Sequence, residues 1–89
     1  MRHRYLEVTF RKGVALAAYL YLPRAAGAAA VSTIDGGHGM RVDLDEHGKP
    51  IGVEITAPSL INVAQLNELL SNYDTEPLAS EEWAPLVAA

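Results

Sequence analysis

Three carboxylates, a histidine and a glycine surround one short turn of this chain. Asp43, Asp45, His47, Gly48 and Glu54 reproduce the spacing of an EF-hand calcium loop, except that His47 stands where an Asp or Asn is expected. An EF-hand loop lies between two helices, whereas the residues on both sides of this turn alternate between apolar and polar, as strands do. A turn between strands accounts for Asp45 and Gly48 without a metal. We therefore expect no metal at this turn.

Three further side chains are of types that ligate metals or act as acid and base: Asp35, His38 and His47. Their spacing matches no recognised motif. No serine lies in a Gly-x-Ser-x-Gly elbow, and the glycine-rich run at 36–39 leads into an expected strand, not into the helix N-terminus of a phosphate loop. We expect no catalytic residue and no cofactor. A small metal-binding enzyme is the most distant alternative.

Tyrosines form the second candidate surface. Tyr5, Tyr19 and Tyr21 fall on the opposite side of two expected strands from the Leu and Val residues. A nucleic-acid stacking platform has basic surroundings, but Glu7 and several alanines flank these tyrosines, and the formal net charge of the chain is −4. We expect no nucleic-acid partner. The tyrosines are expected to form a second buried face or a homodimer contact.

The composition is that of one small folded domain. The 89 residues are 49% hydrophobic and 20% charged, which is enough for a single core. The chain has no cysteine, which suits a reducing compartment. Residues 1–30 have the basic start and apolar run of a signal peptide, but Glu7 interrupts them and strand-like alternation precedes the run. No apolar run is long enough to span a bilayer, so we expect a cytoplasmic protein with no membrane partner.

Two hairpins are expected. Residues 5–10 and 14–22 flank a three-residue loop that ends in Gly13 and would set Tyr5 beside Tyr19. A short strand is expected at 31–34. Residues 40–44 and 51–55 alternate most regularly. The register that buries both of their apolar sets on one face has these opposed pairs: Met40–Ile55, Arg41–Glu54, Val42–Val53, Asp43–Gly52 and Leu44–Ile51.

One helix and an acidic tail complete the expected fold. Asn62 is the expected N-cap, with Gln65 completing a capping box, and apolar residues recur at helical spacing over 63–73. The fold class is then α+β: an antiparallel β-meander of about four strands with one C-terminal helix packed on one face. We divide the chain into a sheet-plus-helix domain, residues 1–73, and an acidic tail, residues 74–89, whose apolar residues would let it dock. A short helical turn is expected at Ser80–Trp83.

Charge is distributed unevenly along the chain. No basic residue follows Lys49. The first twelve residues and the tail carry opposite charges, on Arg2, Arg4, Arg11 and Lys12 and on Asp74, Glu76, Glu81 and Glu82 respectively. We expect a solvated strand end and a solvated tail, with a basic partner for the tail as the alternative.

The second hairpin resembles a known family. Val42–Ile55, preceded by Leu16–Leu22, is similar to the YuzE-like family of small prokaryotic proteins of unknown function. Its signature is an Asp-x-Asp-x-x-Gly turn followed by Gly-x-Glu-Ile, supplied here by Asp43, Asp45, Gly48, Gly52 and Glu54. The resemblance covers roughly residues 5–70. Members often have a Tyr-Asp turn before the first apolar strand, and 10–13 departs from it. The resemblance implies a sheet-plus-helix fold without an assigned activity.

Two functions are expected. The first is a non-enzymatic interaction domain that self-associates as a homodimer through the tyrosine face. The second follows from the resemblance, because some relatives are encoded beside small toxin-like ribonucleases. In that alternative the chain is an antitoxin-like partner that neutralises a small basic toxin, with Trp83 and the acidic tail as its anchor, and the encounter weakens with salt. The candidate interaction surface is Tyr5, Tyr19, Tyr21 and Trp83.

Overall fold

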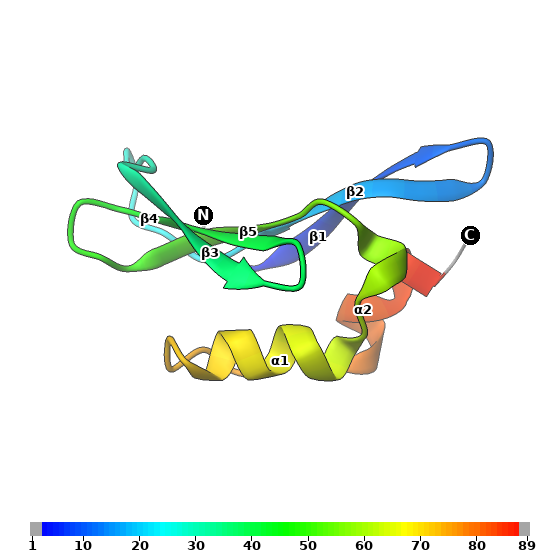
Figure 1. Cartoon of the computed structure of the whole chain (residues 1–89). Coiled ribbons are helices and arrows are strands. Elements are labelled where there is room, and N and C mark those ends of the chain that lie inside the picture. The colour runs from blue at the N-terminus through cyan, green and yellow to red at the C-terminus, as the bar shows by residue number, and fades with distance from the viewer. Residues whose placement is uncertain (1–2, 88–89) are drawn as a thin grey trace.

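Within residues 3–87, which this computed structural model describes, five strands form one antiparallel sheet and two helices lie on one of its faces (Figure 1). The elements are β1 (Tyr5–Arg11), β2 (Val14–Tyr21), β3 (Ser32–Gly37), β4 (Met40–Leu44), β5 (Pro50–Ile55), the 3₁₀ turn η1 (Pro58–Leu60), α1 (Val63–Ser71) and α2 (Ser80–Val87). The α+β class and a helix on one face are confirmed. Arg2 and the last two residues of the expected tail lie outside the described residues.

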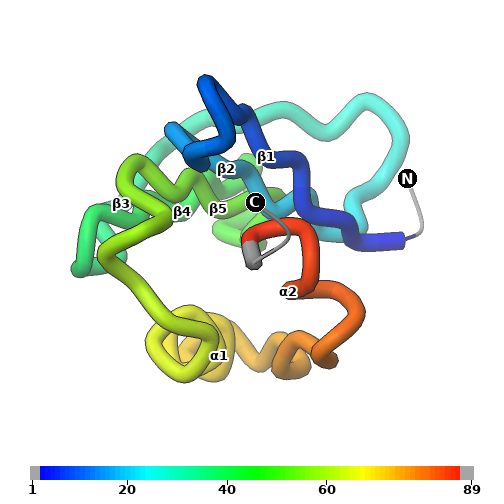
Figure 2. The backbone as a smooth tube through the Cα atoms, turned by 90° about the vertical axis from the view of Figure 1, so that its right-hand side faces the viewer, coloured from blue at the N-terminus to red at the C-terminus, as the bar shows by residue number. Residues whose placement is uncertain are grey.

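The strand order differs from the expected meander. The order across the sheet is β1-β2-β5-β4-β3, so β2 neighbours β5 and not β3. Leu20 lies opposite Val53 and Ala18 opposite Ile55, and all four side chains are buried. The segment at 22–31 carries the chain from β2 to the far edge of the sheet (Figure 2). Strand β5, four of whose six residues are buried, thereby lies at the centre of the sheet, where both of its edges are paired.

The register of β4 and β5 was predicted almost completely. Four expected pairs are confirmed, from Met40–Ile55 to Asp43–Gly52. The fifth is wrong, because Leu44 lies opposite Pro50 and the register shifts between Asp43 and Leu44. This bulge adds one residue, Ile51, at the start of β5 just after the turn.

The register of β1 and β2 was predicted incorrectly, by two residues over Tyr5–Thr9 and by one residue next to the turn. The loop has two residues, Lys12 with φ +53° and Gly13 with φ +78°, which is the geometry of a type I′ turn. A register shift leaves Leu16 without a partner, and Tyr5 then lies opposite Tyr21 instead of Tyr19. A shift of two residues keeps every side chain on its face, so the hydrophobic pattern did not distinguish the two registers.

The core lies between the sheet and the helices. Its buried members come from the three central strands and α1, with Leu78 from the segment before α2. At the start of α1 the expected capping box is confirmed: Asn62 Oδ1 accepts from the Gln65 backbone N–H at 2.9 Å, and Gln65 Oε1 accepts from the Asn62 N–H at 3.0 Å. These two bonds satisfy amide groups that the first turn of a helix leaves free.

The second helix, α2, replaces part of the expected tail. The expected turn at Ser80–Trp83 extends to Val87, and the helix packs against β1. Eight residues with Pro85 among them form a weak helix in isolation, since short helices are marginal and proline disfavours a helix interior. Trp83 and Leu86 pack against the core. Tertiary contacts therefore maintain α2.

Replacing Asn62 by Ala removes the side-chain half of the capping box and should lower the free energy of unfolding by about 1 kcal/mol. Urea denaturation followed by circular dichroism measures the change. Asn72→Ala is the matched control, because Asn72 caps the other end of α1 through its backbone and is exposed. Equal losses in the two variants would contradict the role assigned to Asn62.

Candidate functional site

One face of the sheet is turned away from the helices (Figure 1). The alternation of the strands directs two rows of side chains to this face. The strand pairings place them in order across the sheet. One row is Tyr5, Tyr21, Gly52, Asp43 and Thr33. The other is Glu7, Tyr19, Glu54, Arg41 and Asp35. We call these ten residues the open face. The three tyrosines expected to share a surface lie on it.

The tyrosines contact one another. The rings of Tyr5 and Tyr21 stack with centroids 4.6 Å apart, and the tilted ring of Tyr19 lies 4.7 Å from that of Tyr21. The Arg24 guanidinium lies 6.0 Å from the Tyr21 centroid, a cation–π distance. Tyr21 Oη donates to Glu7 Oε1 at 3.5 Å. Tyr5 remains 49% exposed, so the cluster is accessible to a partner.

One tyrosine reaches across a neighbouring strand. Tyr19 Oη donates to Asp43 Oδ2 at 2.5 Å, and Thr33 Oγ1 donates to Asp43 Oδ1 at 2.7 Å. The Tyr19 ring passes over Gly52, where a Cβ atom would overlap it. Burial and then the bond to Asp43 raise the pKa of Tyr19. The sequence analysis placed Asp43 opposite Gly52 but did not anticipate these two contacts.

The residues with calcium-like spacing do not converge. Asp43 lies on the open face, whereas Asp45 Oδ1 accepts from the backbone N–H groups of His47 at 2.8 Å and Lys49 at 2.9 Å. Both bonds lower the pKa of Asp45, and the bond from the Lys49 N–H has the larger effect on it. Glu54 lies opposite Arg41. No group of three or more His, Asp or Glu side chains within residues 3–87 is placed to hold a metal.

Of the other candidate metal and acid–base residues, Asp35 and His38 line one hollow at the β3–β4 turn, whereas His47 does not. Asp35 Oδ1 accepts from the backbone N–H of Gly37 at 2.8 Å, and the ring of His38 lies 3.4 Å from the Gln65 side-chain amide. His47 is in the turn at the opposite end of β4. The three side chains therefore form no common site.

Arg4 joins the two ends of the described chain. Its Nε and Nη2 donate to the carboxylate of Glu82 at 2.6 Å and 3.0 Å. The same guanidinium donates to the carbonyl oxygens of Glu76 at 2.6 Å and Pro77 at 2.7 Å. The hydrogen bond with Glu82 raises the pKa of Arg4, and it lowers the pKa of Glu82. The opposite charges of the two ends were the only sequence signal of this contact.

Trp83 is not part of the open face. It lies on the helix side of the sheet, half-buried against the core. The neighbouring Glu82 is bound by Arg4 and also accepts from the backbone N–H of Ala79 at 3.0 Å. Two residues of the expected tail anchor thus already have partners within the chain.

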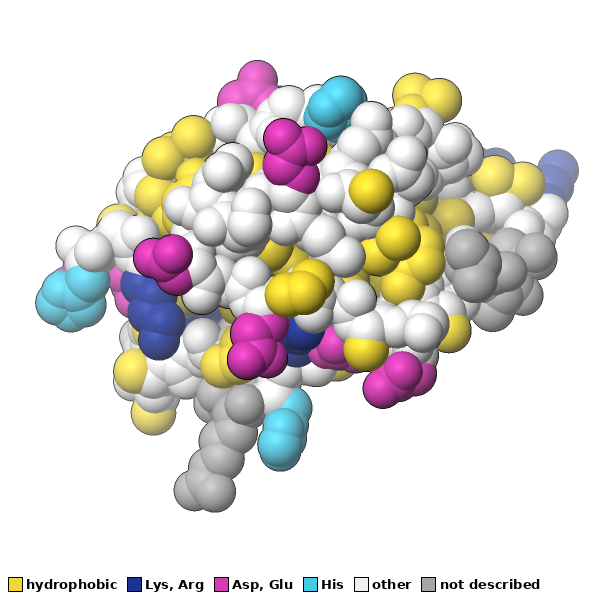
Figure 3. Space-filling model, turned by 90° about the horizontal axis from the view of Figure 1, so that it is seen from below, with side chains coloured by type: hydrophobic (Ala, Val, Ile, Leu, Met, Phe, Trp, Pro, Cys, Tyr) yellow, Lys and Arg dark blue, Asp and Glu magenta, His cyan; other side chains and the backbone are white. Residues whose placement is uncertain are grey.

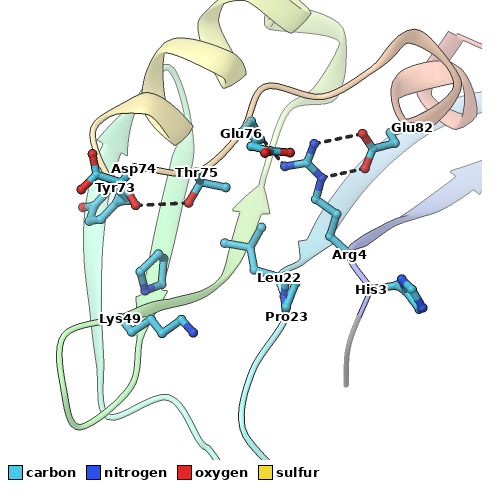
Figure 4. A pocket seen from close by; sticks show the side chains of 11 residues that line it. His3, Arg4, Leu22, Pro23, Lys49, Tyr73, Asp74, Thr75, Glu76 and Glu82 are labelled. Atoms are coloured by element: carbon cyan, nitrogen blue, oxygen red, sulfur yellow. Dashed lines mark hydrogen bonds and ion pairs between the residues drawn. The ribbon is translucent and has the colours of Figure 1, made fainter.

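A cleft of about 590 Å³ opens at the end of the sheet, beside the Arg4–Glu82 contact (Figure 4). Leu22 and the prolines at 23 and 50 line it from the sheet, and Tyr73 and Thr75 line it from the segment that follows α1. Lys49 and His3 lie on its rim together with Asp74 and Glu76. Because both signs of charge surround it, the cleft selects no particular ligand charge.

No protein-family model matches the chain, and neither a curated protein nor a solved structure matches it. In the described part of the chain, no helix has the length and apolar character required to cross a membrane.

Replacing Gly52 by Ala should displace the Tyr19 ring from Asp43 and lower the free energy of unfolding by about 1–3 kcal/mol. In a Tyr19→Ala background the same change should cost much less, because the ring is absent. Urea denaturation of both single variants and the double variant measures this coupling. Additive losses would show that Gly52 does not serve the passage of Tyr19.

The stabilisation from Glu82 should depend on pH. Its pKa is lowered in the folded protein, so the contribution is complete above the ordinary glutamate pKa of about 4.3. It is lost as the pH falls below that value through the folded-state pKa. Glu82→Gln should therefore destabilise the protein at neutral pH and progressively less on acidification. Thermal denaturation across pH measures this, with the exposed Glu81→Gln as control. A pH-independent difference would contradict the assignment.

Proposed function

We propose that this chain is a non-enzymatic interaction domain whose open face binds a positively charged segment of a protein partner. The contact cluster of Tyr5, Tyr19 and Tyr21 among carboxylates carries the proposal. Flat exposed aromatic groups supply contact area at a low cost in side-chain entropy, and are common at protein interfaces.

Charge favours a cationic partner. Four carboxylates belong to the open face, on Glu7, Asp35, Asp43 and Glu54. Arg41 is the one cation among the ten residues, although Arg24 approaches from the β2–β3 connection. The position of Arg24 illustrates the chemistry, since a guanidinium is favourable near tyrosine rings and carboxylates together. A partner segment would repeat this contact on the exposed ring of Tyr5.

The same charges disfavour pairing of two open faces. In a two-fold contact between identical faces, four carboxylates and one arginine would meet the same set on the other copy, and bringing two faces of the same net charge together is costly. The expected homodimer through the tyrosines is therefore less well supported than a basic partner.

The antitoxin-like alternative is a special case of this proposal. A small basic toxin would be such a partner, but it would bind the open face. The expected anchor is occupied, because Glu82 binds Arg4 and Trp83 packs against the core. Membership of the YuzE-like family stays a prediction from the hairpin sequence.

A synthetic arginine–glycine peptide tests the proposal, with a glutamate–glycine peptide of equal length as the negative probe. Calorimetry should detect binding of the arginine peptide only, and the affinity should fall with added salt. The double variant Glu7→Gln, Glu54→Gln should weaken binding roughly tenfold. A lysine–glycine peptide should bind less tightly, because ammonium groups do not stack on rings.

The matched control is Glu68→Gln with Glu81→Gln, which removes the same charge from the helix side. It should leave the affinity nearly unchanged. Equal losses of affinity in both double variants would show that the peptide responds only to the net charge of the protein. Absence of binding at low salt would refute the proposal.

A further inference from the structure

We infer that the outer half of the β1–β2 hairpin is the dimerisation surface of this protein, and that its occupant is the same hairpin of a second copy. This inference does not depend on what the open face binds. It concerns the opposite side of the sheet, and it assigns self-association to residues other than the tyrosines.

The hairpin extends beyond the rest of the sheet (Figure 1). Strand β2 pairs with β5 only over Ala18–Tyr21, so β1 is the only strand that lies beside Val14–Ala17. A two-stranded ribbon is marginally stable in water, and usually requires a third strand or a packed face. Within the described residues no third strand extends this half of the hairpin, and the hairpin is contacted by the short turn η1, against β2, and by α2, against β1.

The ribbon exposes apolar side chains. Phe10 lies on the helix side by the alternation of β1 and is 42% exposed, and Leu16, the extra residue of the bulge, is 48% exposed. Leu60 in η1, which packs against β2, is 76% exposed. Hydrophobic side chains are visible towards this end of the molecule from the helix side (Figure 3). Adjacent exposed apolar groups of this kind mark interaction sites.

Charge identifies the occupant as a second copy. The ribbon ends in Arg11 and Lys12. The chain from residue 57 onward, which forms the helix layer, contains no Lys or Arg and has five carboxylates, on Glu68, Asp74, Glu76, Glu81 and Glu82, of which Glu82 is already paired with Arg4. If two ribbons pack with their helix sides together, each basic tip points towards the acidic helix layer of the other copy. Apolar and charged surfaces are then both complementary, and the contact is two-fold and closed.

The end of α2 adds to this complementarity. Its C-terminal end lies beneath the hairpin (Figure 1), and its last turn contains no basic residue. The carbonyl groups at a helix C-terminus carry partial negative charge and favour a nearby cation. The tip of the second copy would supply one.

Sedimentation equilibrium with single-residue variants tests the inference. The wild-type protein should be a dimer that weakens with salt. Leu16→Glu should weaken dimerisation roughly thirtyfold or more, because the change occurs twice in a two-fold contact. Val31→Glu is the matched control, since Val31 is 65% exposed but lies in the connection before β3. Circular dichroism establishes that both variants fold.

Disulfide crosslinking gives a second readout that does not require a destabilised interface. The chain has no cysteine, so Leu16→Cys should form a covalent dimer on mild oxidation, whereas Val31→Cys should not. A monomeric wild-type protein at millimolar concentration, or equal crosslinking of the two variants, would overturn the inference.

The variants also separate this inference from the proposed function. Glu7→Gln with Glu54→Gln should leave the dimer intact, and Leu16→Glu should still bind the arginine peptide. A dimer that survives Leu16→Glu but dissociates in the Glu7, Glu54 double variant would place the interface on the open face and refute the hairpin contact.

Discussion

The structure depends on one constraint: only one face of its sheet is covered. Successive residues of a strand point to opposite faces, so each strand sends alternate side chains into the core beneath it. Val42, Val53 and Leu20 are buried there. The intervening residues must tolerate water, and all of the polar and aromatic groups of the open face arise in this way. The candidate site therefore results from strand register, with no contiguous motif in the sequence.

Hydrogen bonds join three strands on the uncovered side and pass over a fourth, β5. Tyr19 extends from β2 across β5 to Asp43 in β4, and Thr33 in β3 binds the same carboxylate. The path requires a residue without a side chain at Gly52. A carboxylate that accepts two hydrogen bonds has little freedom to move, so the polar centre of this face is rigid. The exposed rings beside it rest on a fixed support.

Sequence reasoning succeeded where local chemistry determines geometry. The capping box at Asn62 and most of the β4–β5 register follow from residues close together in the chain. It failed by two residues in the first hairpin, because alternation fixes a face and not a position, and the turn at Lys12 decided the outcome. The strand order was not predictable, because the segment at 22–31 that connects β2 to β3 has no hydrophobic periodicity. That the tyrosines share a face was predictable from the alternation of the strands. Their contacts across strands were not predictable, and neither was the contact of Arg4 with its partner 78 residues away.

The contact made by Arg4 also constrains the order in which the chain can fold. Synthesis runs from the N-terminus to the C-terminus, so Arg4 leaves the ribosome 78 residues ahead of Glu82. Four of the five N–H groups of the guanidinium have acceptors between residues 76 and 82. Arg4, the residue just before β1, therefore cannot complete its native contacts until residues 76–82 have been made. Within the described chain, an early segment becomes fully native only after a late one has emerged.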